Sequence, residues 1–219
     1  MNVLAFDCST TGCSAAVVAS GRLLAARTAP PGSGQAEALL PLIAATMAES
    51  GLGWDRIAVI GVTVGPGSFT GLRIGLAAAR GLALAGGIAV AGVTTAEVFA
   101  HAVPADQRRG RTVLVAVDGK RSDIFVQPFA EDLTPLAAVA ALTPDQAAGL
   151  VDGPVLVTGD AAERLAGLLT DMIISGGGPP DAVVVAGLAA ARLAGGRALP
   201  PVPLYLRPPD VTLPPIAPM

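Results

Sequence analysis

The sequence predicts an α/β protein of two domains, each a mixed sheet flanked by helices. Of its 219 residues 52% are apolar and 14% charged, which excludes disorder and favours a large core. Short β-prone apolar runs alternate with segments of helical periodicity in both halves. The polar stretch 104–111, with three arginines, marks the expected boundary. We therefore predict an N-terminal domain over 1–103 and a smaller, more divergent one over 104–219, whose tail returns to the first.

The N-terminal strands are predicted to form an antiparallel start to the first sheet. Residues 2–7 are a short apolar run typical of a buried strand. Thr11-Gly12 is a turn signal, and a second apolar run follows at 13–19. Ser20-Gly21 marks another turn before a third strand at 22–28. Three consecutive strands joined by tight turns pair as neighbours in antiparallel order.

A helix is predicted over 35–50, where leucines and Ile43 recur at helical spacing and Gly51 stands as a terminator. The apolar run 57–64 is a strand, and a glycine-rich loop separates it from a second helix over 72–84. That order of strand, loop and helix presents backbone N–H groups to an anion. A further strand at 88–93 leads into a third helix, capped by Thr94 or Thr95 and reaching His101.

The second half repeats the mixture of strands and helices. A second hairpin is predicted, in which the polar residues 118–123 connect two apolar runs. The expected strands are 113–117, 124–129 and 155–158, the expected helices are 144–150, 161–169 and 180–193, and a short extended piece lies at 204–207.

Composition also narrows the function classes. The longest charge-free stretch of the most apolar region, 81–96, falls short of the roughly 18 to 20 residues of a spanning helix. No basic segment precedes an apolar core at the N-terminus, so we expect a cytoplasmic protein without membrane contact. The net charge of -3 argues against autonomous binding to a phosphate backbone. Cys8 and Cys13 lack zinc-site spacing and are predicted to be small buried side chains.

The first motif is Asp7-Cys8-Ser9-Thr10, at the end of the first strand. It resembles the first phosphate loop of the actin-like ATPase and sugar-kinase superfamily, in which the aspartate approaches metal-bound phosphates. Asp7 capping a turn through its own backbone is the alternative, because short polar side chains do this in many turns. The motif alone leaves both open.

The second motif, residues 65–75 with the sequence GPGSFTGLRIG, is more specific because it fixes eleven consecutive positions. With 6–10, 117–125 and 204–207, in order and spacing, it resembles the TsaB family, paralogues of the catalytic subunit TsaD. The resemblance covers nearly the whole chain and implies two actin-like, RNase H-like domains. Two departures are Gln35, near a position where the family often has histidine, and Gly119, where alanine is more usual.

The resemblance implies a non-catalytic subunit in the synthesis of threonylcarbamoyladenosine on tRNA. Such a subunit binds and activates TsaD, which modifies the adenosine beside the anticodon, while TsaE supplies an ATPase step through the complex. It implies a homodimer when alone, tRNA contact only through the complex, and no cofactor of its own. TsaD-like catalysis is associated with a metal held by paired histidines, and this chain has a single histidine, His101. Ser68 has no candidate base nearby in sequence, which argues against a peptidase.

A stripe of small residues on the second helix is the predicted partner surface. Gly71, Gly75 and Ala79 repeat every four residues, with Leu72 beside them. Glycine inside a helix costs about 1 kcal/mol relative to alanine, so a compensating close contact is expected. That contact is either TsaD or a second copy of the chain, or packing inside the same domain.

Two hypotheses of nucleotide binding stand beside the hypothesis of a non-catalytic subunit. One is a vestigial site for weak ATP or ADP binding, which this subunit does not require. Its residues are Asp7, Ser9, Thr10, Gly65, Gly67 and Ser68. The other is an active ATP-dependent kinase or phosphotransferase, in which Asp7, Ser9, Thr10 and Asp118 hold metal and phosphate.

Overall fold

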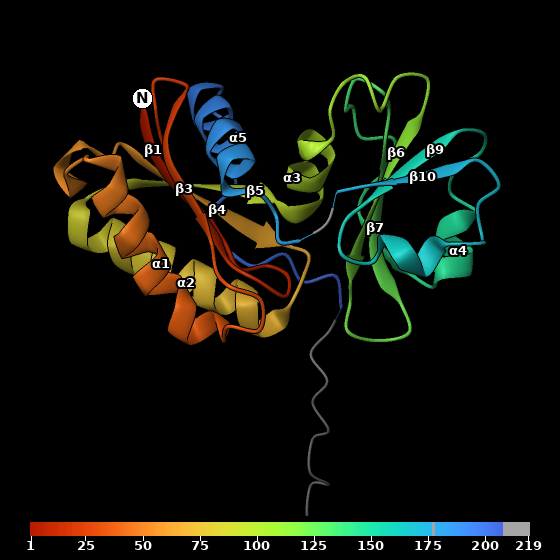
Figure 1. The fold of residues 1–219 in the computed structure, drawn as a ribbon, viewed down its shortest axis with the longest axis horizontal. Coiled ribbons are helices and arrows are strands. Elements are labelled where there is room, and N and C mark those ends of the chain that lie inside the picture. The colour runs from red at the N-terminus through yellow and green to blue at the C-terminus, as the bar shows by residue number, and fades with distance from the viewer. Residues whose placement is uncertain (177, 208–219) are drawn as a thin grey trace, which may run out of the picture.

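In the part of the chain that the structure describes, ten strands form two separate five-stranded sheets, and helices flank both of them. The computed structural model describes residues 1–176 and 178–207. The two sheets stand side by side as two lobes, with helix α3 (Thr95–Ala102) between them (Figure 1). Both sheets mix parallel and antiparallel neighbours, which confirms the predicted α/β class.

The first sheet has the order β3-β2-β1-β4-β5. β1 pairs antiparallel with β2, and β2 with β3, whereas β1–β4 and β4–β5 are parallel. The predicted antiparallel start is therefore confirmed. The strands are β1 (Asn2–Asp7), β2 (Ser14–Ala19), β3 (Arg22–Thr28), β4 (Val59–Gly65) and β5 (Ala89–Thr94).

Helices cover both faces of the first sheet. α1 (Gln35–Ser50) and α2 (Phe69–Gly86) pack on one face, and a short turn of 3-10 helix, η1 (Trp54–Arg56), joins α1 to β4. α1 ends at Gly51, whose φ of 69° is the left-handed conformation that glycine adopts readily. α2 begins three residues earlier than predicted, because Ser68 caps it by accepting a hydrogen bond from Gly71 N–H.

Helix α5 (Ala182–Ala194) covers the opposite face of the first sheet. The sequence analysis placed this helix with the second half of the chain, and that placement is wrong. Val185 and Ala189 are fully buried in one cluster with Val3 and other residues of the first sheet. Arg192 of α5 also pairs with Glu97 of α3. Small side chains let α5 lie close to the strands. Turn residues in the sequence do not indicate that the chain returns to the first sheet after it has formed the second one.

The second sheet has the order β10-β9-β6-β7-β8, with β6–β7 as the predicted hairpin. Its edge strands β8 and β10, of three and four residues, were not predicted. The second 3-10 helix is shorter than the predicted helix. The elements are β6 (Thr112–Asp118), β7 (Ile124–Phe129), β8 (Ala140–Leu142), α4 (Pro144–Ala148), β9 (Val155–Thr158), η2 (Ala162–Leu165) and β10 (Met172–Ser175).

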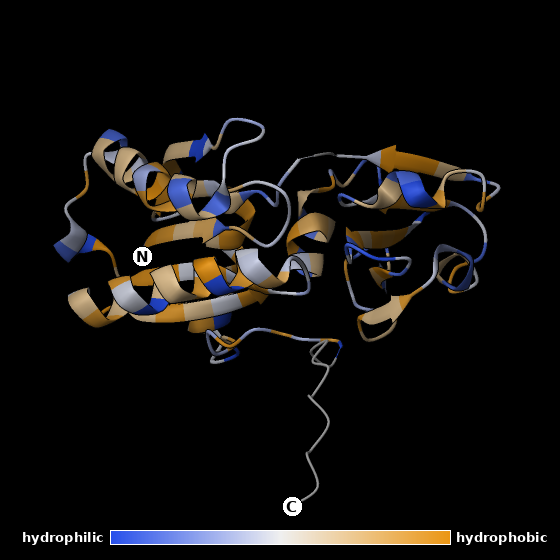
Figure 2. Ribbon diagram, turned by 90° about the horizontal axis from the view of Figure 1, so that it is seen from below, coloured by the Kyte–Doolittle hydropathy of each residue, from blue (hydrophilic) through white to orange (hydrophobic). Residues whose placement is uncertain are grey.

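The side chains of β6 alternate between two small cores. Val113, Val115 and Val117 pack with Phe99 of α3, whereas Leu114 and Ala116 pack with η2 and other residues of the second lobe. α3 therefore joins the lobes, and its Thr94 cap accepts a hydrogen bond from Glu97 N–H as predicted. Figure 2 shows that hydrophobic colours dominate the strands at the centre of both lobes.

The chain after α5 runs back along the first sheet. Leu199 bridges to Gly92 of β5, and Leu204 N–H donates to the Val64 carbonyl at 2.7 Å. The segment at 204–207 thus lies beside the first lobe, while 208–219 fall outside the described residues. Within 1–176 and 178–207, no helix combines the length and apolar character needed to cross a membrane. The domain limits at 103 and 104 remain a prediction.

Candidate functional site

The first turn, residues 7–13 between β1 and β2, contains a buried carboxylate. Asp7 is fully buried, and its Oδ1 accepts hydrogen bonds from Ser9 N–H at 3.0 Å and Thr63 Oγ1 at 2.6 Å. Oδ2 has no hydrogen-bond partner among the described residues. Burial raises the pKa of Asp7 from 3.8 to about 6, because the charged form loses water, and the hydrogen bonds only partly offset this.

The backbone of the first turn is covered by the start of α2 and by α1. Ser68 N–H donates to the Ser9 carbonyl at 2.7 Å, and Gln35 Nε2 donates to the Thr10 carbonyl at 2.6 Å. A methyl group on Gly67 would lie 2.0 Å from the Ser9 carbonyl oxygen. Backbone therefore meets backbone where the sequence predicted a phosphate, and Ser68 N–H already has a protein acceptor. The vestigial nucleotide site stays a prediction.

Gly71 and the cysteines complete this closed packing. A methyl group on Gly71 would lie 1.9 Å from the Cys8 carbonyl oxygen. Cys8 and Cys13 are free and buried, as predicted. Gln35, which lies near the position where the family often has histidine, donates to the Cys8 carbonyl at 2.9 Å. Its amide thus anchors the first turn to α1, a role that the sequence analysis missed because nothing in the local pattern connects residue 35 with residue 8.

The second turn, residues 118–123 between β6 and β7, has the opposite character. Asp118 Oδ1 accepts from Lys120 N–H at 2.9 Å, and its Oδ2 pairs with Lys120 Nζ at 2.8 Å. Arg164 NH1 lies 3.6 Å from the same carboxylate. Burial acts to raise the pKa of Asp118, but the hydrogen bonds and positive charges outweigh it, so the pKa is lowered. Asp118 is thus held as an ion.

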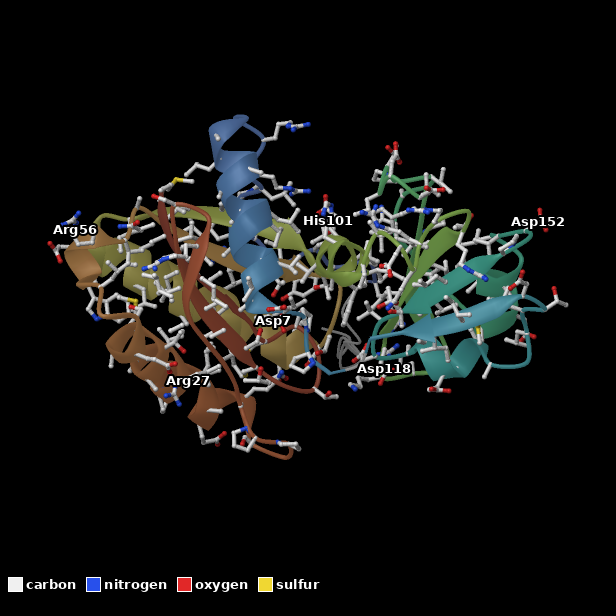
Figure 3. All side chains as sticks on the ribbon, turned by 45° about the horizontal axis from the view of Figure 1, so that its top comes forward. Asp7, Arg27, Arg56, His101, Asp118 and Asp152 are labelled. Atoms are coloured by element: carbon white, nitrogen blue, oxygen red, sulfur yellow. The ribbon has the colours of Figure 1, made fainter. Side chains whose placement is uncertain are left out.

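Asp160 follows β9 and reaches the second turn. Its Oδ1 accepts from Asp118 N–H at 2.8 Å, and burial raises its pKa. It also lies close enough to Asp7 to raise the pKa of that carboxyl. Asp160 was not among the predicted site residues, and it lies two residues after the end of β9, whereas Asp7 and Asp118 are the last residues of β1 and β6. Figure 3 shows Asp7 and Asp118 on the sides of the two lobes that face each other.

The three aspartates do not make a metal centre. No group of three or more His, Cys, Asp or Glu side chains that could hold an ion exists within residues 1–176 and 178–207. His101 lies on α3, away from both turns in Figure 3. Asp7 and Asp118 are two carboxylates with opposite pKa shifts, raised at Asp7 and lowered at Asp118.

A cleft of about 640 Å³ opens between the start of α2, the second turn and the segment at 204–207. We call it the interlobe cleft. Phe69 and Tyr205 stack in it with ring centroids 5.4 Å apart, and the Arg73 guanidinium lies 3.9 Å from the centre of the Phe69 ring. Its lining residues are Gly67, Ser68, Phe69, Thr70, Arg73, Gly119, Lys120, Arg121, Phe125, Leu204, Tyr205, Leu206 and Arg207.

Gly119 has a structural reason in this cleft. Arg207 donates to the Gly119 carbonyl at 3.2 Å, pairs with Asp123, and lies 4.6 Å from the centre of the Phe125 ring. A methyl group at position 119 would come within 2.4 Å of the Arg207 guanidinium. Glycine at position 119 therefore leaves room for Arg207, so that the segment at 204–207 can pack against the second turn.

The small-residue stripe of α2 faces the interior of the first lobe. Gly71, Leu72, Gly75 and Ala79 are all buried. A methyl group on Gly75 would make ordinary contacts with Cys8 Cβ at 3.7 Å and Val62 Cγ2 at 3.8 Å. Packing inside the same lobe, which the sequence analysis left open, is the observed role. All four are buried in the single chain, and a partner interface at them stays a prediction.

The opposite side of α2 forms an apolar groove with α1, which we call the outer groove. It encloses about 500 Å³. Leu40 of α1 is 56% exposed beside it, and Leu84 of α2 is 88% exposed one turn beyond it. Its lining residues are Ala36, Leu39, Leu40, Ile74, Ala77, Ala78, Gly81 and Leu82.

Two facing lobes with an aspartate-bearing turn in each define a protein of the actin-like α/β class. YeaZ from Pseudomonas aeruginosa has the same fold, with a TM-score of 0.80 and 24% identity over 94% of this chain and 99% of that one. The ROK hexokinase from Thermus thermophilus has a TM-score of 0.52 and 18% identity, over 88% of this chain and 100% of that one. These likenesses show the fold.

The family model described as TsaD, tRNA N6-adenosine threonylcarbamoyltransferase, matches residues 33–192, and the chain belongs to this family. An uncharacterized protein of Mycobacterium tuberculosis is 30% identical over 95% of this chain and 92% of its own length. The tRNA threonylcarbamoyladenosine biosynthesis protein TsaB of Escherichia coli is 32% identical over 60% of this chain and 56% of its own length. The predicted TsaB-like character is confirmed.

Proposed function

We propose that this chain is a non-catalytic cytoplasmic subunit in the synthesis of threonylcarbamoyladenosine on tRNA, and that it binds and activates TsaD. The family match and the TsaB relatives support the pathway. The closed first turn supports the non-catalytic role. In it, Ser68 N–H binds the Ser9 carbonyl, and Gly67 leaves no space beside that oxygen. TsaE acts through the complex, and tRNA modification takes place on TsaD.

An ATP-dependent kinase or phosphotransferase is the second candidate. It is favoured by Asp7 and Asp118, which end the first strand of each sheet on the facing sides of the lobes. Phosphoryl transfer depends on charged groups that position metal and phosphate. Asp7 instead is fully buried, with Ser9 and Thr63 bound to its Oδ1, and Lys120 pairs with the carboxylate of Asp118. The kinase thus needs both turns to rearrange, whereas the subunit role needs neither to move.

The two candidates are separated by one measurement on the purified chain. We expect no hydrolysis of Mg-ATP and no tRNA modification by the chain alone, and recovery of modification when TsaD, TsaE and substrates are added. Robust ATP hydrolysis by the isolated chain would favour the kinase. An Asp118→Asn variant supplies the control, because a true phosphotransferase loses turnover with it while a subunit keeps its support of TsaD.

The outer groove is the surface that we assign to TsaD. Apolar area on an exposed helix pair favours association, since covering it removes it from water. Leu40 and Leu84 are exposed there, and the small residues Ala77 and Gly81 let another helix approach closely. A second copy of the chain fits the same surface, so homodimer and TsaD complex compete for it.

A charged substitution in the outer groove tests this assignment. We expect Ala77→Glu to abolish TsaD pull-down and to turn the homodimer into a monomer in sedimentation, with an unchanged melting temperature. Ala191→Glu is the matched control, because Ala191 is an exposed helical alanine of α5 on the opposite face of the first lobe. Normal TsaD capture by Ala77→Glu would sink the assignment.

A further inference from the structure

The lining of the interlobe cleft differs from the rest of the chain in composition. Phe69, Phe125 and Tyr205 line it, although the whole sequence has only five phenylalanines, one tryptophan and one tyrosine. Arg73, Lys120, Arg121 and Arg207 are lining residues too, and no Asp or Glu is among those lining residues that the structure describes. A chain with a net charge of -3 thus gathers cations and aromatic rings at one cleft.

Two of these rings form a fixed, half-exposed platform. Phe69 is 49% exposed and Tyr205 is 44% exposed, and their planes are 30° apart. Arg73 holds the pair, since it lies over Phe69 and its Nε donates to Tyr205 Oη at 3.0 Å. Burying either ring would be favourable, so the exposed area is available for a flat apolar partner.

The positively charged side chains of the cleft differ in whether they pair with a carboxylate. Lys120 pairs with Asp118, and Arg207 pairs with Asp123. Arg73 contacts a ring and a hydroxyl, and has no carboxylate partner among residues 1–176 and 178–207. A ligand that brings one negative charge next to the aromatic platform therefore meets Arg73 first, with Lys120 on the facing lobe.

We propose that the interlobe cleft holds one unstacked nucleotide of single-stranded RNA. Its base stacks on the Phe69–Tyr205 platform, and its phosphate lies beside Arg73 and Lys120. Sites for single-stranded RNA combine these two features, aromatic faces for bases and cations for the backbone. A volume of about 640 Å³ is sufficient for one nucleotide. The site adjoins the closed first turn through Gly67 and Ser68, and it rests on the proposed function, in which the complex handles tRNA.

Fluorescence anisotropy with a labelled single-stranded heptaribonucleotide tests the proposal, on the full chain alone and on its one-to-one mixture with TsaD. We expect Tyr205→Leu and Phe69→Leu each to weaken binding about tenfold, because stacking on one ring is worth that much. Trp54→Leu is the matched control, since Trp54 is 43% exposed on η1 and does not line the cleft. Its affinity should equal that of the unaltered chain.

A charge pair of variants tests the phosphate contact. Arg73→Gln should weaken binding and reduce the slope of log affinity against log salt by about one. Arg56→Gln is the control, because Arg56 lies at the outer end of the first lobe (Figure 3). Thermal melting verifies folding of each variant. If Phe69→Leu does not fold, Tyr205→Leu, near the end of the described chain, decides the stacking contact.

Three results would overturn the proposal. They are absence of RNA binding both with and without TsaD, equal binding of duplex RNA, and displacement of the RNA by free ATP with the same sensitivity to Tyr205→Leu. The last result would indicate a mononucleotide site. TsaD pull-down distinguishes failure of the RNA site from failure of the proposed subunit role. Variants that lose RNA binding but still bind TsaD are consistent with the subunit role. RNA binding without any TsaD binding would support the RNA site in the interlobe cleft and contradict the proposed subunit role.

Discussion

The two turns that follow β1 and β6 share one topology and differ in nearly everything else. Each connects the first strand of its sheet to an antiparallel neighbour, and each begins at an aspartate. Most of the first turn is buried, and its backbone carbonyls accept hydrogen bonds from Ser68 N–H and the Gln35 amide. The second turn carries Lys120 and Arg121 and lines the interlobe cleft.

The fold sets the position of each aspartate, and the neighbouring residues set the direction of its pKa shift. The fold places Asp7 and Asp118 on facing lobes in equivalent positions. Burial raises the pKa of Asp7, whereas Lys120 and Arg164 outweigh burial at Asp118 and lower its pKa. An aspartate at the end of the first strand of a sheet in an actin-like fold therefore does not define a phosphate site by itself; the space and charge around it do.

The largest expected effect comes from reopening the first turn. Gly67→Ala puts a methyl group 2.0 Å from the Ser9 carbonyl oxygen, so backbone must shift, and we expect a loss of about 3 kcal/mol or more in the free energy of unfolding. Gly81→Ala is the control, since nothing lies within 4 Å of that position, and it should add up to about 1 kcal/mol. Urea unfolding measures both. Equal stability of the two variants would show that the first turn is not closed by this contact.

The opposite pKa directions of the two aspartates give the next effect. Because the pKa of Asp7 is raised in the folded protein, protonation favours folding. Its contribution to stability is complete below the ordinary pKa of 3.8 and is lost as pH rises through about 6. The loss is roughly 3 kcal/mol at most, at about 1.4 kcal/mol for each tenfold change in protonation. Asp7→Asn should abolish this fall in a series of urea titrations.

Asp118→Asn supplies the comparison in the same titrations. The pKa of Asp118 is lowered, so its contribution is present above the ordinary pKa and is lost as pH falls. The difference curves of the two variants against the unaltered chain should therefore slope in opposite directions. Curves of the same sign would contradict the contrast between the turns.

A smaller effect is expected where α2 packs on the first turn. Gly75 lies in ordinary contact distance of Cys8 and Val62, so leucine there overfills the core and should cost about 1 to 3 kcal/mol. The measured quantities are melting temperature and TsaD capture at a temperature where the variant remains folded. We expect early melting with capture retained. A stable variant that no longer captures TsaD would return the small-residue stripe to the partner surface.

The smallest effect belongs to the second turn. Lys120→Gln removes an exposed ion pair with Asp118, and exposed pairs contribute between zero and about 1 kcal/mol. We expect a change below about 0.5 kcal/mol in the free energy of unfolding, while RNA affinity falls. A larger loss of stability would mean that the second turn, like the first, is built mainly for folding.

The sequence predicted local structure well and long-range neighbours poorly. α1 and the strands β1, β3, β7 and β9 have the predicted bounds, because periodicity and turn residues are local signals. The seat of α5 on the first sheet and the stacking of Phe69 on Tyr205 join residues more than 100 positions apart. The small-residue stripe of α2 was recognised, but spacing alone cannot tell an inner from an outer face.

The seat of α5 also sets an order of events during translation. Val3, Ala5 and Val59 form one face of the first sheet, and the helix that covers them starts roughly 90 residues after β5 ends. At about 5 to 20 residues per second, a ribosome needs between about 5 and about 20 seconds to make that interval. Throughout it the apolar face of the first sheet has no helix to cover it.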